Sequence, residues 1–310
     1  MKTRLFTLAA LAAIAVSCSN EDGIAPQDNL KDTPITVTAG VEQLSTRAGY
    51  EGTTTLPTTF YLSMTQDTEN ADSKYNYTDV AMTNGGSGTS YTPADGSNLL
   101  WASYDRNSAK INAYTILGTS VSVKTDQSTA GGVDVTASDL IGAVYANADS
   151  DISISDNSIA IKFRHLLCKL NIRLSWNSEF DAVTADKKSI TGVKLTGLNT
   201  TATLARATAA ISAPGTEADI RAYLNGTEAE AIFAPSASAT KTEFTITVTT
   251  LINGVERVFK ATASAPDGFV SGNAYTVSLA LGGEKVDAVT AQSKAWEDVY
   301  GDTPQDIETH

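Results

Sequence analysis

The feature that most constrains the fold of this chain is a series of short runs in which apolar and polar residues alternate. A repeat of two residues places every second side chain on one face of a β-strand. No long segment has apolar residues at the three- and four-residue spacing of an amphipathic helix. The sequence therefore predicts an all-β protein. The main alternating or continuous apolar runs are 35–41, 60–64, 111–116, 121–123, 140–145, 244–248, 255–259 and 275–281.

One stretch, Ile159 to Trp176, carries the alternation for longer than an ordinary strand. Its apolar residues keep one parity as far as His165 and take the opposite parity from Leu166 onward. A change of parity within a strand requires an inserted residue, so we expect a β-bulge near Leu166-Leu167. A strand that changes face can serve two cores, which indicates a domain boundary close by.

Turn and loop signals separate the runs. Asn253-Gly254 stands between two apolar runs and is typical of a type I′ hairpin turn. Segments 84–98, 199–216 and 235–241 are expected to be long loops.

Residues suited to catalysis or metal binding are scarce. His165 and Cys168 are the one candidate nucleophile–base pair, but residues three apart on a regular strand point to opposite faces. The only other histidine is His310, so no histidine-based zinc site is expected. The net charge of −13 argues against nucleic acid as a partner. The sequence therefore predicts no enzymatic activity, no cofactor and no metal.

The N-terminus has the organisation of an export signal. A short basic stretch precedes an apolar run from Leu5 to Val16, which is shorter than the ~20 residues of a membrane-spanning helix. Small or apolar residues stand directly before Cys18, and this arrangement resembles a bacterial lipobox. Cys18 would then be acylated and would anchor the chain in outer-membrane lipid. The alternative is an ordinary signal peptide with an unrelated cysteine.

Four features together resemble the fimbrillins, or type V pilins, of anaerobic Gram-negative bacteria. They are the lipobox at Cys18, the run Ile35–Val41 followed by Ser45-Thr46-Arg47-Ala48, the segment Ile161–Leu170 with its apolar-x-apolar-x-His pattern, and Gly272–Leu279 with Ala295-Trp296 beyond it. In that family a trypsin-like protease cuts the lipidated precursor after an arginine. The N-terminal strand then leaves, and a strand of the next subunit takes its place.

The resemblance implies cleavage between Arg47 and Ala48, with residues 33–41 as the removable strand. Its inward side chains are expected to be Ile35, Val37, Ala39 and Val41. The donated strand of the family comes from the C-terminal tail. The corresponding residues here would be Val286, Ala288, Val289 and Trp296. Alternation is poor in this tail, so a fixed last strand with a frayed end is the alternative.

The alternation and the resemblance together give a domain plan with two tandem β-sandwiches of the transthyretin-like, Greek-key kind. The expected parts are a signal peptide 1–17, a lipidated propeptide 18–47, an N-terminal sandwich 48–160, a C-terminal sandwich 161–284 and a tail 285–310.

Two functional hypotheses stay open. The first is a structural subunit or adhesin of a cell-surface fimbria, with other fimbrial subunits, a trypsin-like processing protease and outer-membrane lipid as partners. The second is a monomeric surface lipoprotein, tethered through Cys18, that binds glycans or another host or bacterial surface ligand. The aromatic residues considered for stacking on sugar rings are Trp101, Tyr104, Tyr91 and Trp296.

Overall fold

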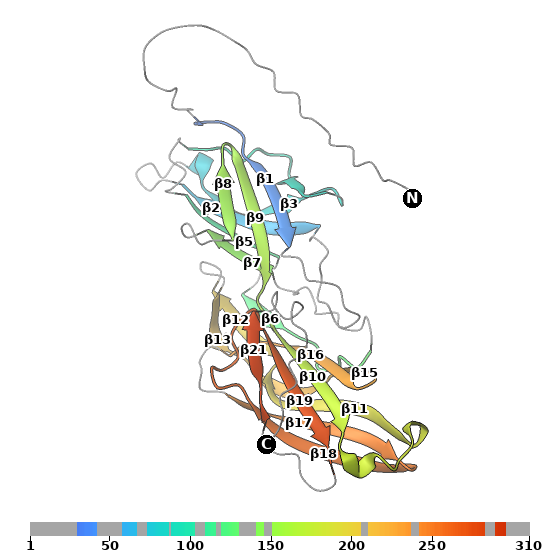
Figure 1. The fold of residues 1–310 in the computed structure, drawn as a ribbon. Helices are drawn as coiled ribbons and strands as arrows, with labels where there is room; N and C mark the ends of the chain where they lie inside the picture. The colour runs from blue at the N-terminus through green and yellow to red at the C-terminus, as the bar shows by residue number, and fades with distance from the viewer. Residues whose placement is uncertain are drawn as a thin grey trace, which may run out of the picture.

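The structure is a computed structural model with two lobes stacked end to end (Figure 1). It describes residues 30–41, 58–66, 73–86, 88–102, 109–115, 119–129, 141–145, 151–205, 210–236, 242–282 and 289–295. Each lobe has its own hydrophobic core. In the sequence, Phe163 is the last residue of the core of lobe one, and Cys168 is the first residue of the core of lobe two. Among the described residues, no helix is long and apolar enough to cross a membrane.

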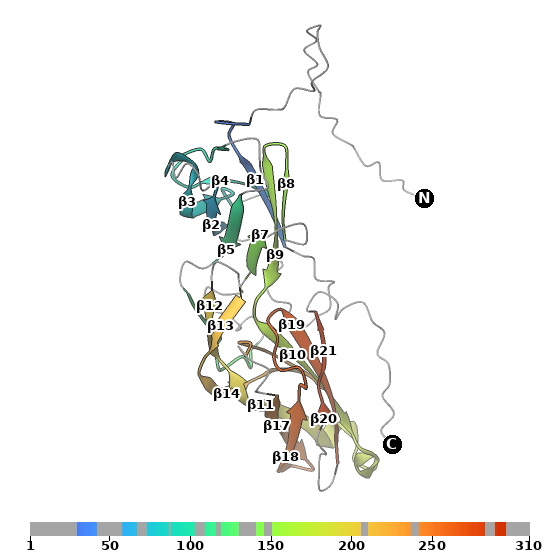
Figure 2. The same cartoon turned by 90° about the vertical axis from the view of Figure 1, so that its left-hand side faces the viewer.

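Lobe one is a ring of strands flattened into two layers. Its strands are β1 (Thr36–Val41), β2 (Thr59–Thr65), β3 (Tyr77–Thr83), β4 (Ser90–Pro93), β5 (Lys110–Tyr114), β7 (Ile141–Tyr145), β8 (Ile152–Ser155) and β9 (Ser158–His165). They are ordered β1-β4-β3-β2-β5-β7-β9-β8, and a further β1–β9 pairing closes the ring. β1, β8 and β9 lie in one layer, and β2, β3 and β5 lie in the other (Figure 2).

The core of lobe one is centred on an aromatic cluster. The Phe60 ring meets Tyr91 edge-on at 4.8 Å between centroids and Phe163 at 5.2 Å. Phe60 and Phe163 are fully buried, and Tyr91 is nearly so. Edge-to-face contacts of this kind stabilise a core beyond the area that they bury. The cluster therefore joins β2, β4 and β9 across the two layers.

Lobe two is a sandwich of two five-stranded sheets, ordered β15-β16-β10-β19-β21 and β14-β11-β17-β18-β20, with a small sheet β13-β12-β6 beside them. Its strands are β6 (Ser120–Ser122), β10 (Cys168–Trp176), β11 (Lys188–Asn199), β12 (Thr201–Ala205), β13 (Ala210–Pro214), β14 (Glu217–Arg221), β15 (Tyr223–Asn225), β16 (Glu228–Phe233), β17 (Glu243–Ile252), β18 (Val255–Ser264), β19 (Asn273–Leu281), β20 (Val289–Thr290) and β21 (Gln292–Ala295).

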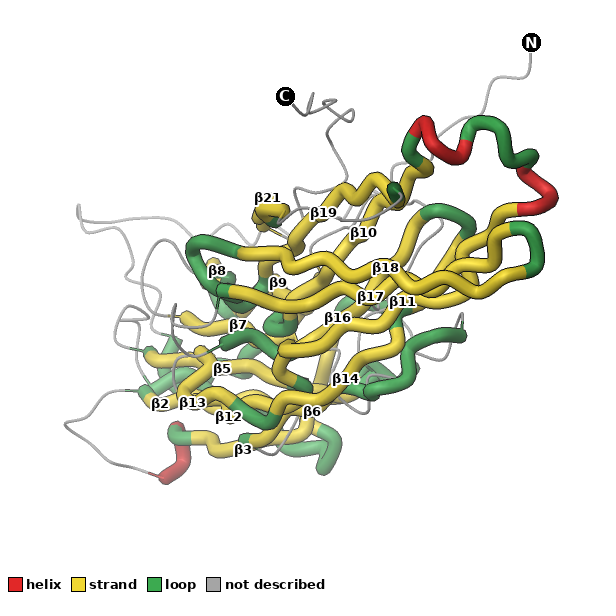
Figure 3. Tube along the Cα trace, turned by 90° about the horizontal axis from the view of Figure 1, so that it is seen from below, coloured by secondary structure: helices red, strands yellow, loops and turns green. Residues whose placement is uncertain are grey.

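The alternation predicts the inward faces of these sheets. On β17, the side chains of Phe244, Ile246 and Val248 are buried in the core, while the intervening threonines are partly exposed. Asn253 and Gly254 have φ values of 50° and 79°, which confirms the predicted type I′ turn. Within the described residues the helical elements are three short 3-10 segments, Ser73–Tyr75, Ser178–Phe180 and Ala185–Lys187, and strands make up most of the rest (Figure 3). The predicted all-β fold with two sandwiches is confirmed.

The predicted β-bulge near Leu166-Leu167 is wrong. The change of parity is present, but β9 ends at His165 and β10 begins at Cys168. The chain therefore leaves the sheet of lobe one and enters that of lobe two, and the two leucines between them are buried. A pattern of alternation alone does not distinguish one bulged strand from two strands in different sheets.

Two of the three expected loops are also wrong. Segment 84–98 contains β4, and segment 199–216 contains β12 and β13. β4 has a single buried side chain, Tyr91, among polar residues and a proline, so it carries no apolar alternation. Such a strand is held by its backbone pairing, which the sequence does not display. Residues 237–241 of the third expected loop lie outside the described residues.

Candidate functional site at the N-terminal strand

The N-terminal strand β1 occupies a central position in lobe one. It runs parallel to β9 from Thr36↔Ser158 to Val41↔Phe163. On its other edge it pairs antiparallel with β4, with Val37 opposite Tyr91. β1 is thus inserted between two strands that follow it in the sequence, and it closes the ring.

The inward side chains of β1 complete the hydrophobic core. Val37 is 2% exposed and Ala39 is 4% exposed, and both belong to the core cluster of lobe one. Ile35, just before the strand, is partly buried against the same cluster. The side chains of these three residues therefore point toward the core, as the alternation predicts. The side chain of Val41, the fourth predicted position, lies outside the described residues.

The residues that precede β1 are also fixed to lobe one. The backbone N–H of Asp32 donates to the carbonyl of Trp101 at 3.0 Å, and the N–H of Ile35 donates to the carbonyl of Leu99 at 2.8 Å. The N–H of Trp101 donates in return to the carbonyl of Thr33 at 3.1 Å. Residues 30–41 are therefore held along their whole described length.

An ion pair anchors the start of this segment. The Asp32 carboxylate accepts hydrogen bonds from the Lys74 ammonium and, at 2.9 Å, from the Tyr75 hydroxyl. The Lys74 hydrogen bond, followed by that from Tyr75, lowers the pKa of Asp32. Both side chains of the ion pair are about half exposed, so solvent screens the interaction.

Loss of β1 would leave two strand edges unpaired beside an opened core. The N–H and C=O groups of β4 and β9 that now face β1 would lack partners, and the cavity left by Val37 and Ala39 would face water. An unpaired edge next to exposed apolar side chains is a strong template for another strand. A replacement strand would regain both the ladder hydrogen bonds and the side-chain pockets.

The predicted lipidation and cleavage residues, Cys18, Arg47 and Ala48, lie outside the described residues. In the sequence, Arg47 follows the last residue of β1, Val41, after a short segment. A cut there would therefore separate β1 from the rest of the ring.

The tail that was considered as a donated strand pairs within its own lobe. Val289 begins β20, which runs parallel to β18 with Val289 opposite Ala263. β21 then pairs antiparallel with β19. Ala291, between them, is 4% exposed in the core of lobe two. The other predicted tail residues, Val286, Ala288 and Trp296, lie outside the described residues.

The residues considered for other chemistry do not form a site. Cys168 is fully buried, and burial raises the pKa of its thiol well above the ordinary value, which disfavours the reactive thiolate. His165 ends a different strand in the other lobe. No group of metal-ligating side chains occurs among the described residues.

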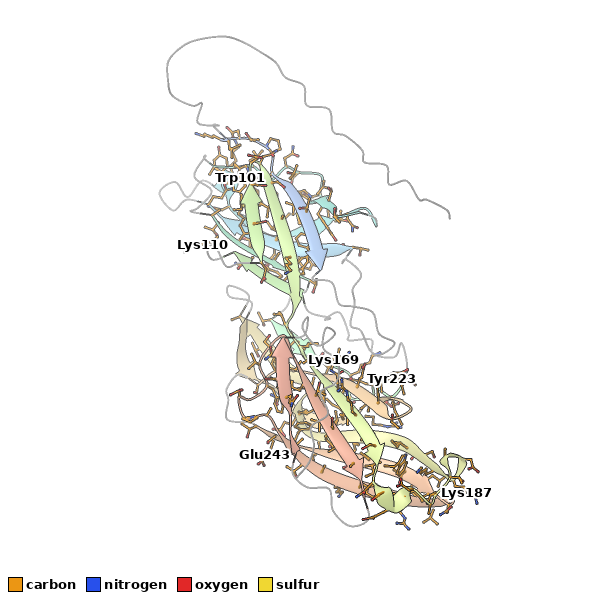
Figure 4. All side chains as sticks on the ribbon, in the orientation of Figure 1. Trp101, Lys110, Lys169, Lys187, Tyr223 and Glu243 are labelled. Carbon is orange, nitrogen blue, oxygen red and sulfur yellow. The ribbon has the colours of Figure 1, made fainter. Side chains whose placement is uncertain are left out.

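Two of the aromatic residues considered for sugar stacking are part of the core. Tyr91 is 3% exposed and Trp101 is 1% exposed, so neither presents a ring face to a ligand. Trp101 lies in lobe one at the end far from lobe two (Figure 4). Tyr104 and Trp296 lie outside the described residues.

The sequence missed the second partner of β1. Tyr91 belongs to the segment 84–98, which was expected to be a loop, yet this segment supplies β4. The residues just after it, Leu99 and Trp101, make the backbone contacts to residues 32–35. The available signals were the single apolar residue Tyr91 and the short apolar run Leu99–Trp101 in a polar stretch. Tyr91, Leu99 and Trp101 are buried.

Comparison with family models gives a match that covers most of the chain. The model described as fimbrillin-like matches residues 46–296. The chain belongs to the fimbrillin-like family. The match begins at residue 46, a few residues after β1 ends at Val41, so the N-terminal strand lies outside the matched region. A comparison with curated proteins gives no match.

Solved structures with the same fold include proteins from Bacteroides and Porphyromonas. A candidate cell adhesion protein of Bacteroides uniformis has a TM-score of 0.55 at 19% identity, covering 88% of this chain and 100% of its own. One from Bacteroides ovatus has a TM-score of 0.53 at 14% identity, covering 85% and 96%. The tip fimbrial protein Mfa3 of Porphyromonas gingivalis, with a C-terminal truncation, has a TM-score of 0.50 at 10% identity, covering 85% and 98%.

Family membership settles the broad class. This chain is a member of a family of fimbrial proteins, which are surface proteins and not enzymes.

Proposed function

We propose that this chain is a structural subunit or adhesin of a surface fimbria that assembles by strand exchange after its N-terminal segment is removed at Arg47-Ala48. The observation that carries the proposal is the position of β1 between β4 and β9, with Val37 and Ala39 in the core. Other fimbrial subunits would supply the replacing strand, and a trypsin-like protease would make the cut.

The pairing of β1 suits a replaceable strand. β1 does not pair with β2, the next strand in the sequence. Its two neighbours, β4 and β9, lie much further along the chain, and the pairing with β9 is parallel. A cut between β1 and β2 therefore breaks no turn that the ring needs. Once cut, β1 is held by its backbone ladder, by its few buried side chains, by the hydrogen bonds of residues 32–35 to Leu99 and Trp101, and by the Asp32 ion pair. A second strand could replace the ladder and the buried side chains.

The remaining parts of the proposal concern the ends of the chain. Residues 1–17 act as a signal peptide, Cys18 carries lipid that tethers the precursor to the outer membrane, and residues 18–47 form the propeptide with its removable strand 33–41. The first sandwich ends with β9 (Ser158–His165), and the second begins with β10 (Cys168–Trp176). The tail 285–310 is the candidate donor, and its release would require β20 and β21 to leave lobe two.

The test is native proteolysis of the chain that begins at Ser19. Trypsin is added to the folded protein, the new N-terminus is determined, and assembly is followed as oligomers that resist SDS. The proposal predicts a cut after Arg47, loss of residues 19–47 and a ladder of oligomers.

Two variants make this test specific. Arg47→Ala should block both the cut and the ladder. Arg257→Ala is the matched control, because Arg257 is an exposed arginine on β18 in lobe two, away from β1. Oligomers that form equally well from Arg47→Ala, or cleavage at Arg47 that leaves a stable monomer, would contradict strand exchange and favour the tethered ligand-binding lipoprotein.

A further inference from the structure

The strands β10 and β19 lie side by side in one sheet of lobe two and run in the same direction (Figure 1). Their register extends over eight positions, from Lys169↔Ala274 to Trp176↔Leu281. The chain between them forms β11 to β18, which are most of the other strands of lobe two. Separation of β10 from β19 would therefore open the whole lobe.

Backbone hydrogen bonds extend this pairing at both ends. Before the paired region, the N–H of Gly272 donates to the carbonyl of Leu167 at 3.1 Å. After it, the N–H of Asn177 donates to the carbonyl of Leu281 at 2.9 Å. The segment from residue 167 to residue 177 is therefore bonded to β19 and the residue before it.

Both strands also pack their side chains into the core of lobe two. The buried residues that they contribute are Leu170, Ile172 and Leu174 on β10, and Tyr275, Val277, Leu279 and Leu281 on β19. On the opposite face of β10, Lys169 is 1% exposed, and its ammonium lies 3.4 Å from the Glu230 carboxylate of β16. Sliding of one strand along the other would therefore displace many buried side chains in the same step.

The attachments of the two strands decide how a pull would load them. β10 begins at Cys168 and is joined to β9 of lobe one by Leu166 and Leu167. β19 ends at Leu281, from which the chain continues to the tail strands β20 and β21. Because β10 and β19 are parallel, the attachment to lobe one and the attachment to the tail lie at opposite ends of the pair. A pull between lobe one and the tail would therefore draw the strands past each other.

Such a pull loads the bonds between the two strands in shear. The bonds of a sheared ladder must yield together, whereas two strands that are pulled apart from the same end lose their bonds one after another. Forced unfolding depends on the barrier to unfolding and not on the equilibrium stability, so the direction of the pull sets the force that is needed. The same pair of strands is therefore expected to resist shear more strongly than separation from one end.

We propose that β10 and β19 form a mechanical clamp that carries tension through lobe two, from lobe one to the residues beyond Leu281. The inference rests on the proposed function for the source of the load, because β20 and β21 must leave lobe two before a neighbouring subunit can pull directly on Leu281. The resistance itself is a property of lobe two and does not depend on strand exchange.

The experiment pulls single molecules of the chain that begins at Ser19, in which Cys168 is buried, through handles on introduced cysteines. The shear geometry uses Lys162→Cys on β9 with Ala280→Cys on β19. The matched geometry, which separates the strands from one end, uses Glu179→Cys just after β10 with the same Ala280→Cys. All three side chains are exposed. From residue 162 the load follows the backbone of β9 directly into β10.

The clamp predicts that the shear geometry ruptures at a force at least about twofold higher than the matched geometry at the same pulling speed. Rupture of lobe two in either geometry releases β11 to β18 and lengthens the chain by more than roughly 300 Å, at ~3.5 Å per residue. Equal hydrogen exchange in β17, with and without the new cysteines, is the control for the fold.

Equal rupture forces in the two geometries, or a higher force for the pair at residues 179 and 280, would overturn the inference. The measurement involves neither the cut at Arg47 nor the formation of oligomers. A failure of strand exchange and a failure of the clamp are therefore told apart.

Discussion

Each lobe of this fimbrillin-like chain is completed by a segment near one end of the sequence, but the two segments are held differently. β1 lies inside the ring of lobe one, paired on both edges, and contributes Val37 and Ala39 to the core. β20 and β21 lie at the outer edges of the two sheets of lobe two, each paired on one side, with Ala291 as the buried residue between them.

The comparison indicates that lobe one depends more on its terminal segment. Withdrawal of β1 would open two strand edges and the aromatic core, whereas withdrawal of the tail would expose one edge of each sheet and an alanine. The apolar area exposed is larger in the first case, and buried apolar area stabilises by about 25 cal/mol per Å². An empty site in lobe one would therefore bind a replacement strand more strongly than the vacated edges of lobe two.

The largest effect is expected from a charge in the inward face of β1. Val37→Asp places a carboxylate without a partner among buried apolar side chains and should destabilise lobe one by roughly 4 kcal/mol or more. Hydrogen exchange followed by mass spectrometry should show lost protection in β1, β4 and β9, with β17 still protected. Thr36→Asp, on the exposed face of the same strand, is the control. Equal loss in both variants would contradict the dependence of lobe one on β1.

A smaller effect is expected at a buried ion pair in lobe two. Lys169 is 1% exposed, and its ammonium lies 3.4 Å from the Glu230 carboxylate. Lys169→Ala removes the cation and should lower the free energy of unfolding of lobe two by about 3 kcal/mol. Chemical denaturation would measure it. The double variant Lys169→Met with Glu230→Gln should recover much of the loss, and a double variant as unstable as Lys169→Ala would contradict this role for the pair.

A still smaller effect is expected at Gly215, beside the small sheet of lobe two. An added Cβ would lie 1.8 Å from the carbonyl oxygen of Thr201, so the backbone would have to shift. Gly215→Ala should lower the free energy of unfolding by about 2 kcal/mol and increase hydrogen exchange in β12 and β13, without loosening β1. Gly192→Ala is the matched control, because an added Cβ there meets nothing within 4 Å. A similar loss in both variants would show that crowding is not the cause.

The smallest effect concerns the ion pair that holds the start of the N-terminal segment. The pKa of Asp32 is lowered from 3.8 in the folded protein, so its contribution to stability is present above that value and is lost as the pH falls through the lowered pKa. Hydrogen exchange in residues 30–41 should therefore increase on acidification to this range. Asp32→Asn should show that increase already at neutral pH and should remove the pH dependence. An unchanged pH dependence in Asp32→Asn would assign the effect to other carboxylates.

The alternation of side chains located most strands and their inward faces. It failed where a polar residue is buried or where a strand has no apolar alternation. It placed Val37 and Ala39 inward on β1, as observed. Lys169 alternates with the apolar residues of β10 and is therefore on the side that the pattern marks as polar, yet this lysine is buried beside Glu230. β4 was missed because backbone pairing and a single aromatic side chain hold it. These features depend on neighbours that lie far away in the sequence.

The sequence by itself determined that the chain is built of strands and which side of most strands is apolar, because both follow from a repeat of two residues. Only the tertiary structure decided that β1 fills a place between β4 and β9, and that residues 119–129 pair with lobe two. The physical reason is that a strand pairs with the neighbours that let the ring of strands close and the core become buried. Ring closure and core burial depend on the whole folded lobe and not on the local sequence.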